Sequence, residues 1–205
     1  MLIATDRAAA VHISTMTGKL AGIFAVNTNT LTNTFCSRMR GTTAICSVCY
    51  SAAMLQGSRK NCAPAFERNS VLLSAALIPA ERLPVINAAI FRFHGHGELI
   101  NPTHLENFYR IAEKNPATTF SLWTKRRDLI RSGRAAPANF ILIYSNPSLS
   151  KLMTKPPARF DKVFNNVKVD YAGPANCTGQ RCIDCRICYT QGGENVVIEH
   201  VKKRS

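Results

Sequence analysis

Blocks of apolar residues, separated by polar segments that carry glycine or proline, set the rhythm of the middle of the chain. Continuous apolar blocks are typical of buried strands, whereas apolar residues spaced three and four apart are typical of helices. The pattern predicts, in order, a strand over 86–95, a helix over 101–115, a strand over 118–123, a short basic helix over 125–133 and a strand over 139–145. This alternation predicts a parallel sheet with helices packed against it.

The flanking segments extend the pattern in both directions. They predict strands over 9–15 and 19–26, a polar loop over 27–34, and a cysteine-bearing segment over 36–62 that is irregular in its first half. A helix over 65–78 would turn one apolar side inward, made of Phe66, Val71, Leu72, Ala75 and Ala76. The last predicted elements are a short helix over 147–153 and strands over 163–171 and 196–201.

These elements predict a single α/β domain over residues 1–205, built as a partial (half) TIM-like barrel or an open parallel sheet with cysteine-rich loops. The chain is too short for the roughly 250 residues of an eight-fold barrel. In such folds, functional residues gather at the carboxyl ends of the strands. We therefore expect the turns over 94–99, 123–127 and 144–147 to share one face.

Composition favours a folded protein without membrane contact. Hydrophobic residues make up 46% of the chain and charged residues 19%, which is typical of globular proteins. Residues 1–15 carry no apolar run of signal-peptide length, and no later stretch reaches the roughly 18 apolar residues of a membrane-spanning helix. We expect a cytoplasmic protein.

The net charge of +14 points to an anionic partner. A basic surface attracts nucleic acid, nucleotides or an acidic protein, although a solvated positive surface without a dedicated ligand explains the same number. The candidate contacts are Lys125, Arg126 and Arg127, which follow Trp123. Such residues bind phosphates, and an aromatic ring can stack on a base.

The strongest chemical signal is a run of four cysteines near the end of the chain. Cys177, Cys182, Cys185 and Cys188 follow the spacing C-x4-C-x2-C-x2-C. Thiolates are the ligands of iron–sulfur clusters and of many zinc sites, and gaps of two residues let successive sulfurs wrap one centre. Zinc sites more often combine two separated pairs, so the crowded run favours a [4Fe–4S] cluster, with zinc as the alternative.

A second set of cysteines lies nearer the start. Cys36, Cys46 and Cys49 have the spacing C-x9-C-x2-C, and Cys62 follows twelve residues after the last of them. Three thiols leave one iron of a four-iron cube open to a small ligand, whereas four close it. Buried structural thiols are the alternative explanation for this set.

The turn predicted after the strand over 86–95 carries further polar groups. His94 and His96 alternate with glycines and could ligate metal or transfer protons. Gly97 would let a ligand approach the backbone, and Glu98 could hold an amine or a cation. A glycine-bearing turn with exposed imidazoles is the alternative.

The order of these pieces resembles a phage protein family named after gene product eighty-eight of a mycobacteriophage. The matching segments are 36–50, 91–99, 115–125, 142–148 and 177–188. The same order is similar to a trimmed radical-SAM core. That similarity implies a cluster on Cys36, Cys46 and Cys49 and a Gly97–Glu98 turn that holds the amine of S-adenosylmethionine (SAM). The chain departs from the radical-SAM loop, which has C-x3-C-x2-C.

Three functional hypotheses follow from the sequence. The first is a non-catalytic bacteriophage iron–sulfur protein of the host cytoplasm, with a structural, redox or partner-binding role. The second is a radical-SAM-like enzyme with SAM as a further cofactor. The third is a zinc-stapled basic protein that binds nucleic acid.

Overall fold

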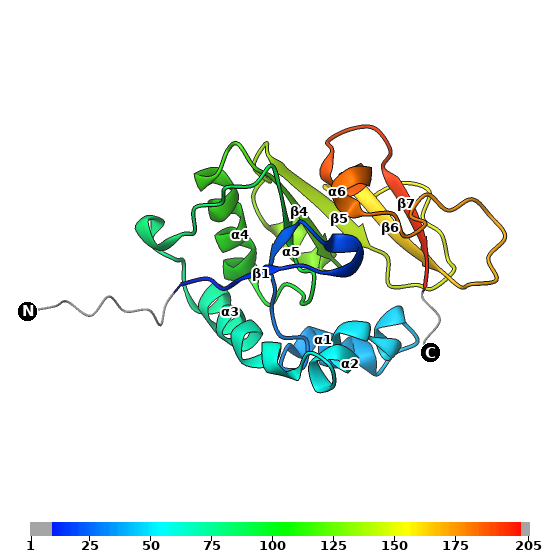
Figure 1. The fold of residues 1–205 in the computed structure, drawn as a ribbon, viewed down its shortest axis with the longest axis horizontal. Helices are drawn as coiled ribbons and strands as arrows, with labels where there is room; N and C mark the ends of the chain where they lie inside the picture. The colour runs from blue at the N-terminus through cyan, green and yellow to red at the C-terminus, as the bar shows by residue number, and fades with distance from the viewer. Residues whose placement is uncertain (1–9, 202–205) are drawn as a thin grey trace, which may run out of the picture.

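A seven-stranded sheet, whose strand order follows the chain order, forms the centre of the computed structural model, which describes residues 10–201 (Figure 1). The strands are β1 (Ile13–Thr15), β2 (Phe24–Val26), β3 (Ile90–Phe93), β4 (Thr119–Thr124), β5 (Phe140–Ser145), β6 (Lys162–Val167) and β7 (Val196–His200). β1 pairs with β2 in antiparallel fashion, and every later pair is parallel. β1 and β7 form the two edges, so the predicted open parallel sheet is confirmed.

Six α-helices and several short 3-10 helices connect the described strands. The α-helices are α1 (Thr34–Arg40), α2 (Tyr50–Gln56), α3 (Ala63–Ala75), α4 (Pro102–Lys114), α5 (Arg127–Ser132) and α6 (Cys182–Cys185). The 3-10 helices are η2 (Gly18–Leu20), η3 (Ile45–Val48), η4 (Lys60–Cys62), η5 (Ala80–Arg82) and η6 (Ile187–Tyr189). In Figure 1, α1 and α2 lie below the sheet and α6 lies at the opposite, upper side.

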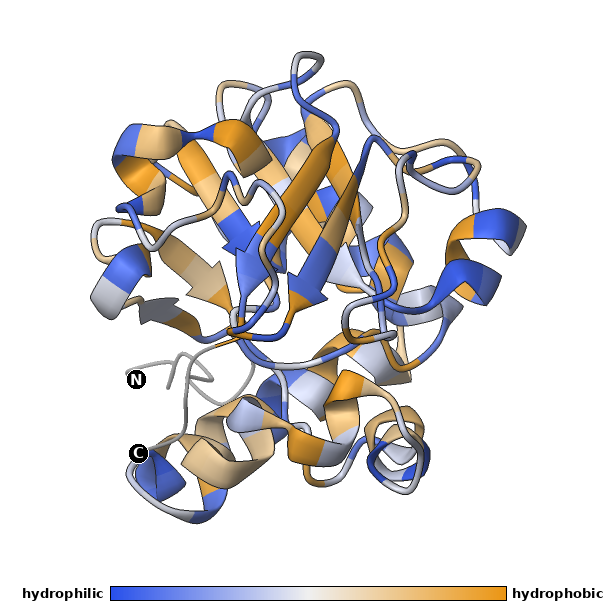
Figure 2. Ribbon diagram, turned by 90° about the vertical axis from the view of Figure 1, so that its right-hand side faces the viewer, coloured by the Kyte–Doolittle hydropathy of each residue, from blue (hydrophilic) through white to orange (hydrophobic). Residues whose placement is uncertain are grey.

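Alternating side chains of the strands build two apolar layers, one on each face of the sheet. On the face covered by α3, α4 and α5, which we call the helix face, Phe91, Phe93, Phe120 and Phe140 pack with Leu73, Phe108 and Leu129. On the opposite face, which we call the loop face, Trp123, Ile141 and Ile143 pack with Tyr189 and with residues of η2 and α6. The strands are accordingly apolar along most of their length (Figure 2).

Asn101 begins α4 as its sequence predicts. Its side-chain oxygen accepts a hydrogen bond from the backbone N–H of His104 at 3.0 Å, and Pro102 occupies the first helical turn. The cap satisfies one of the backbone donors that a helix start leaves without a partner.

Replacing Asn101 with alanine should lower the free energy of unfolding by about 1 kcal/mol, because the helix loses its cap. The Asn101 amide also donates to the Ser74 carbonyl at 2.9 Å. Asn101→Asp retains the cap acceptor but not this donor, so chemical denaturation of both variants separates the two contacts. An alanine variant as stable as the native chain would contradict the role of the cap.

Three predicted features of the secondary structure are wrong. Residues 147–153 form turns and bends instead of a helix, because the Asn146 side chain accepts from the Ser148 backbone and donates to the Lys151 carbonyl. The strand predicted over 139–145 is therefore not followed by the helix expected after it. The first half of 36–62 is also more regular than predicted, since α1 spans Cys36.

The third wrong feature is part of the predicted inner side of α3: Phe66 is buried and Leu72 packs against the core as predicted, but Ala75 and Ala76 are exposed. Phe66, Asn69, Ser70 and Leu73 are buried, whereas Val71 is 58% exposed. Hydrogen bonds explain why a different side of the helix faces inward than the sequence predicts. Asn69 bonds with the His12 and Asn27 backbones, and Ser70 accepts from the Asn29 N–H. The helix therefore turns its polar residues toward the segment that follows β2.

In the part of the chain from residue 10 to residue 201, no helix is long and apolar enough to cross a membrane. Most of the start segment predicted to lack a signal peptide lies outside the described residues.

Candidate functional site

The turn after β3 forms the centre of one candidate site. Glu98 is 5% exposed, and its carboxylate accepts hydrogen bonds from the Thr124 hydroxyl and from the backbone N–H groups of Leu99 and Lys125. Burial raises the pKa of Glu98, and Lys125 is the strongest of the groups that oppose this shift. A buried carboxylate therefore stands at the carboxyl ends of β3 and β4, where the sequence predicts functional residues.

Gly97 gives this turn its shape. Its φ is +121°, and a Cβ atom at this position would lie 2.1 Å from Thr28 Oγ1 and 3.0 Å from His94 Cδ2. His94 itself has a φ of +63°. Only glycine fits at position 97, because the segment after β2 lies against its backbone.

The first cysteine set lies against this turn. The Cys36 N–H donates to the Asn33 side chain, whose amide donates to the Glu98 carbonyl, and α1 packs against η3, which contains Cys46. Burial is the main cause that raises the pKa of Cys36 to about 12, with smaller contributions from Glu98, Cys49 and Cys46 and an opposing one from Lys125. Cys36, Cys46 and Cys49 thus share one neighbourhood with the predicted Glu98.

Hydrogen bonds hold the α1–α2 segment in this position. The Ile45 N–H donates to the Pro147 carbonyl at 2.9 Å, and the Tyr50 hydroxyl donates to the Gly95 carbonyl at 2.6 Å. The Asn33 amide donates to the Glu98 carbonyl at 3.0 Å. The segment therefore covers the carboxyl ends of the strands, and the turns after β3, β4 and β5 share one face as expected.

Cys62 stands apart from this set. Its thiol is half-buried and contacts the side chain of Asn61, and none of the main influences on the pKa values of Cys36 and Cys46 comes from it. The structure does not bring Cys62 to the other three thiols.

The second cysteine set lies on the loop face, beside η2 and β7. Cys182 and Cys188 pack against Trp123 and Tyr189, and the Cys177 thiol lies beside Lys19 of η2. Burial is the main cause that raises the pKa of Cys188 to about 12, with smaller contributions from Cys177, Cys182 and Cys185. All eight cysteines are free and half-buried.

Two cations flank this second set. Lys19 pairs with Glu199, and its Nζ lies 3.7 Å from Cys177 Sγ. Arg92 is the strongest opposing influence on the raised pKa values of Cys182 and Cys188. The first set lies against the turn at Glu98, and the second packs against Trp123 and Tyr189 on the loop face.

Neither set has the geometry of a closed metal site. Within residues 10–201, no three His, Cys, Asp or Glu side chains are arranged to hold one metal ion.

The three basic residues that were predicted to bind nucleic acid make different contacts in the structure. Lys125 donates to the Ser145 hydroxyl at 2.7 Å and lies beside the first cysteine set. Arg126 donates to the Leu99 and Ile100 carbonyls and pairs with Asp128. Of the three, only Arg127 is exposed.

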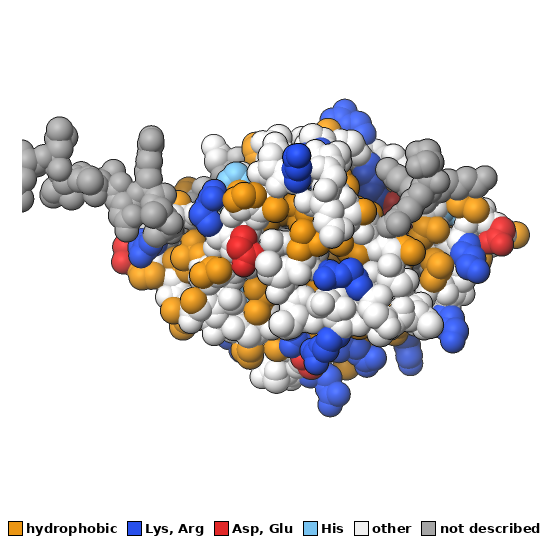
Figure 3. Space-filling model, turned by 90° about the horizontal axis from the view of Figure 1, so that it is seen from below, with side chains coloured by type: hydrophobic (Ala, Val, Ile, Leu, Met, Phe, Trp, Pro, Cys, Tyr) orange, Lys and Arg blue, Asp and Glu red, His pale blue; other side chains and the backbone are white. Residues whose placement is uncertain are grey.

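Other basic residues lie on the helices below the sheet. Arg38, Lys60 and Arg68 are exposed there, and Figure 3 shows Lys and Arg side chains spread over this underside with few acidic ones. The basic surface is therefore broader than the predicted helix.

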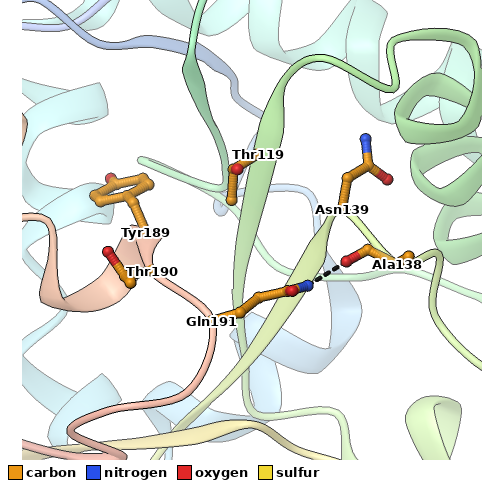
Figure 4. Close-up of a pocket in the computed structure, with 6 residues that line it drawn as sticks. All are labelled: Thr119, Ala138, Asn139, Tyr189, Thr190 and Gln191. Carbon is orange, nitrogen blue, oxygen red and sulfur yellow. Dashed lines mark hydrogen bonds between the residues drawn. The ribbon is translucent and has the colours of Figure 1, made fainter.

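A shallow hollow of about 460 Å³ lies at the other end of the sheet. It is lined by Thr119, Ala138, Asn139, Tyr189, Thr190 and Gln191 (Figure 4). Gln191 donates a hydrogen bond to the Ala138 carbonyl across it. Thr119 begins β4 and Asn139 precedes β5, so the hollow lies at the amino ends of these strands, whereas Glu98 lies at the carboxyl ends. No cysteine lines the hollow.

Sequence reasoning missed four residues of the two sites. Arg92, Lys19 and Glu199 adjoin the second set, and Tyr50 anchors the first. Arg92 carried a usable signal, since a charged residue interrupts the apolar run of β3. Lys19 and Glu199 carried none, because 179 residues of sequence separate them.

Comparison with known protein families gives one match. The model of the family described as Gene product 88 matches residues 4–172. The chain belongs to the Gene product 88 family. This match confirms the resemblance to a phage gene-product family. Its span includes Cys36, Cys46, Cys49 and Glu98 and ends before the second cysteine set. No curated protein and no solved structure matches the chain.

Proposed function

We propose that this Gene product 88 protein is an iron–sulfur protein that holds a [4Fe–4S] cluster on Cys177, Cys182, Cys185 and Cys188. Its role is non-catalytic, in structure, electron transfer or partner binding. It acts in the reducing cytoplasm of the infected host, where free thiols persist.

One observation carries this proposal: the chain folds the C-x4-C-x2-C-x2-C run against η2 and Tyr189, with Cys182 and Cys188 in one apolar cluster and Cys177 beside Lys19. Partial exposure leaves them accessible to an incoming metal. The donor set fits the group, because a [4Fe–4S] cluster takes four cysteine thiolates and a compact spacing of this kind. Metal binding releases the thiol protons, so loading should improve as the pH rises.

The first test is the content of iron, acid-labile sulfide and zinc in protein purified without oxygen. About four iron and four sulfide per chain, with a brown charge-transfer band, would support one cluster, and about eight would support a cluster on each set. Zinc without sulfide would overturn the proposal. It would favour a zinc-stapled basic protein, whose affinity for nucleic acid should fall steeply with salt.

Replacing Cys182 with alanine should remove the iron and sulfide of the second set, a loss of about four of each per chain. The matched control is Cys62→Ala, which makes the same chemical change at a thiol outside both sets and should leave the content unchanged. Metal analysis of the two variants measures the difference. Full metal content in the Cys182 variant would refute the assignment.

A second candidate is a radical-SAM-like enzyme, which the first cysteine set supports. Cys36, Cys46 and Cys49 lie near Glu98 and Lys125, and three thiols would leave one iron of a cluster open. Glu98 could then accept the amine of SAM. The Thr124, Leu99 and Lys125 donors already hold both Glu98 oxygens in place.

This candidate requires that SAM perturb the reduced cluster. Addition of SAM should change its electron paramagnetic resonance spectrum, and the Glu98→Gln variant should reduce that change. A spectrum that SAM does not alter would exclude the enzyme and leave the non-catalytic proposal standing.

A further inference from the structure

The sheet carries an arginine in an otherwise apolar strand. Arg92 lies on the loop face of β3, between two phenylalanines that point to the helix face. Its guanidinium carbon lies 3.7 Å from the ring centroid of Trp123, and its Nε donates to the His94 carbonyl at 3.3 Å. These contacts hold the guanidinium in place over the sheet.

Arg92 has no anionic partner of its own. The ion pairs among residues 10–201 are made by Lys19, Arg126, Arg134 and Arg181, and none involves Arg92. A half-buried cation without a counter-ion costs free energy, because its hydration is reduced and neutral groups replace only part of it.

The groups in front of Arg92 belong to the second cysteine set. Tyr189, which follows Cys188, lies on the same Trp123 ring at 5.7 Å between centroids. The Ser121 hydroxyl donates to the Cys188 carbonyl at 2.6 Å and so fixes the loop against β4. Arg92 therefore stacks on the ring that Tyr189 also contacts, and Cys182 and Cys188 pack against the same apolar cluster.

The other cation of this site is already neutralised. Lys19 pairs with Glu199, so together they contribute little net charge. A protonated thiol carries no charge. Four thiolates around a 2+ centre instead carry a net charge of about −2.

We propose that Arg92 is the counter-ion of the metal centre on the C-terminal cysteines, held in position by its stacking on Trp123. This inference rests on the proposed function and adds a positioning residue to it. Because a nearby cation favours the more negative, reduced form of a cluster, Arg92 should raise its reduction potential.

The test compares Arg92→Gln with the native chain and with Arg181→Gln, in metal-free and reconstituted protein. Arg181 lies in the cysteine loop with a side chain that is 61% exposed, so its replacement removes the same charge from a solvated position. Loaded Arg92→Gln protein should release iron about 10- to 100-fold more readily. Its cluster should have a more negative potential, and the Arg181 variant should change neither quantity.

The metal-free proteins give the decisive contrast. Without an anion to face, Arg92 should not stabilise the fold, so metal-free Arg92→Gln should unfold at a denaturant concentration equal to or above that of the native chain. A purely structural arginine predicts the opposite. A metal-free variant that is less stable or fails to fold would overturn the proposal, as would unchanged iron release and potential.

The metal content of the native chain distinguishes a failure of the proposed function from a failure of the proposed role of Arg92. Native protein without iron or zinc would overturn the proposed function itself. Native protein with metal, whose retention is the same in Arg92→Gln, would overturn only the role of Arg92. If the metal is zinc, a comparison of zinc release from native and Arg92→Gln protein still tests the role of Arg92.

Discussion

Lowering the pH from 7 to 5 should reduce the free energy of unfolding of the metal-free protein by about 2 kcal/mol for each of His94 and His96. Burial lowers the pKa of His94 to about 3 and that of His96 to about 4. Both imidazoles therefore stay neutral in the folded chain while they gain protons in the unfolded chain. The stability that they contribute is present above pH 6.5 and is lost as the pH falls toward the folded pKa values.

His104 adds to this loss of stability at low pH. Burial lowers its pKa well below the ordinary value, and its ring lies 5.3 Å from that of His94 between centroids. Neither ring nitrogen of His94 has a side-chain or backbone partner of good geometry within the described residues, nor does Nε2 of His104. The burial of His94 outweighs the backbone of Trp123, which favours the charged form of the ring.

Urea unfolding at pH 7 and pH 5 measures the effect, and His96→Asn identifies its source. The asparagine oxygen can take the place of the His96 Nδ1 atom, which lies 2.9 Å from the Ser51 hydroxyl. This variant should lose about 2 kcal/mol of the pH dependence. His12→Asn, at an exposed histidine, should retain all of it. Equal stability at the two pH values would show that the buried histidines accept protons in the folded state.

Replacing Phe93 with alanine should lower the free energy of unfolding by about 3–5 kcal/mol. Phe93 is fully buried and its ring centroid lies 4.0 Å from that of Phe108, 5.2 Å from that of Phe120 and 5.6 Å from that of Phe140. Alanine would lose these contacts and leave a cavity between α4 and the sheet.

The matched control for this variant is Phe24→Ala. The Phe24 side chain is 41% exposed at β2, so the same change removes less buried surface and should cost much less. Chemical denaturation at pH 7 compares the two. Similar losses for both variants would mean that the aromatic stack contributes no more than a half-exposed ring.

The sequence alone predicts the sheet because its strong signals are local. The apolar blocks at β3, β4 and β5 and the cap at Asn101 each act within a few residues. The predicted inner side of α3 fails for a physical reason. Its polar Asn69 and Ser70 face inward to bond backbone groups near β2, and such long-range partners leave no periodic trace.

The same limit applies to the candidate sites. The cysteine spacing identifies both sets, and the strand–helix order correctly predicts that Glu98 and Lys125 meet. The arginine at position 92 becomes meaningful only when the loop that carries Cys182 and Cys188 is seen to pack on the loop face beside β4. Its missing carboxylate partner is a property of the folded surface.

The strand order of the sheet has a consequence for how this family can vary. Because β7 is an edge strand, the segment after residue 172 can be gained or lost without rethreading the other six strands. Its loss would strip Lys162, which is 1% exposed, of the Gly192 and Glu194 carbonyls that receive its ammonium group. Family members without the C-terminal cysteines should therefore lack a lysine at this position, and the two features should be inherited together.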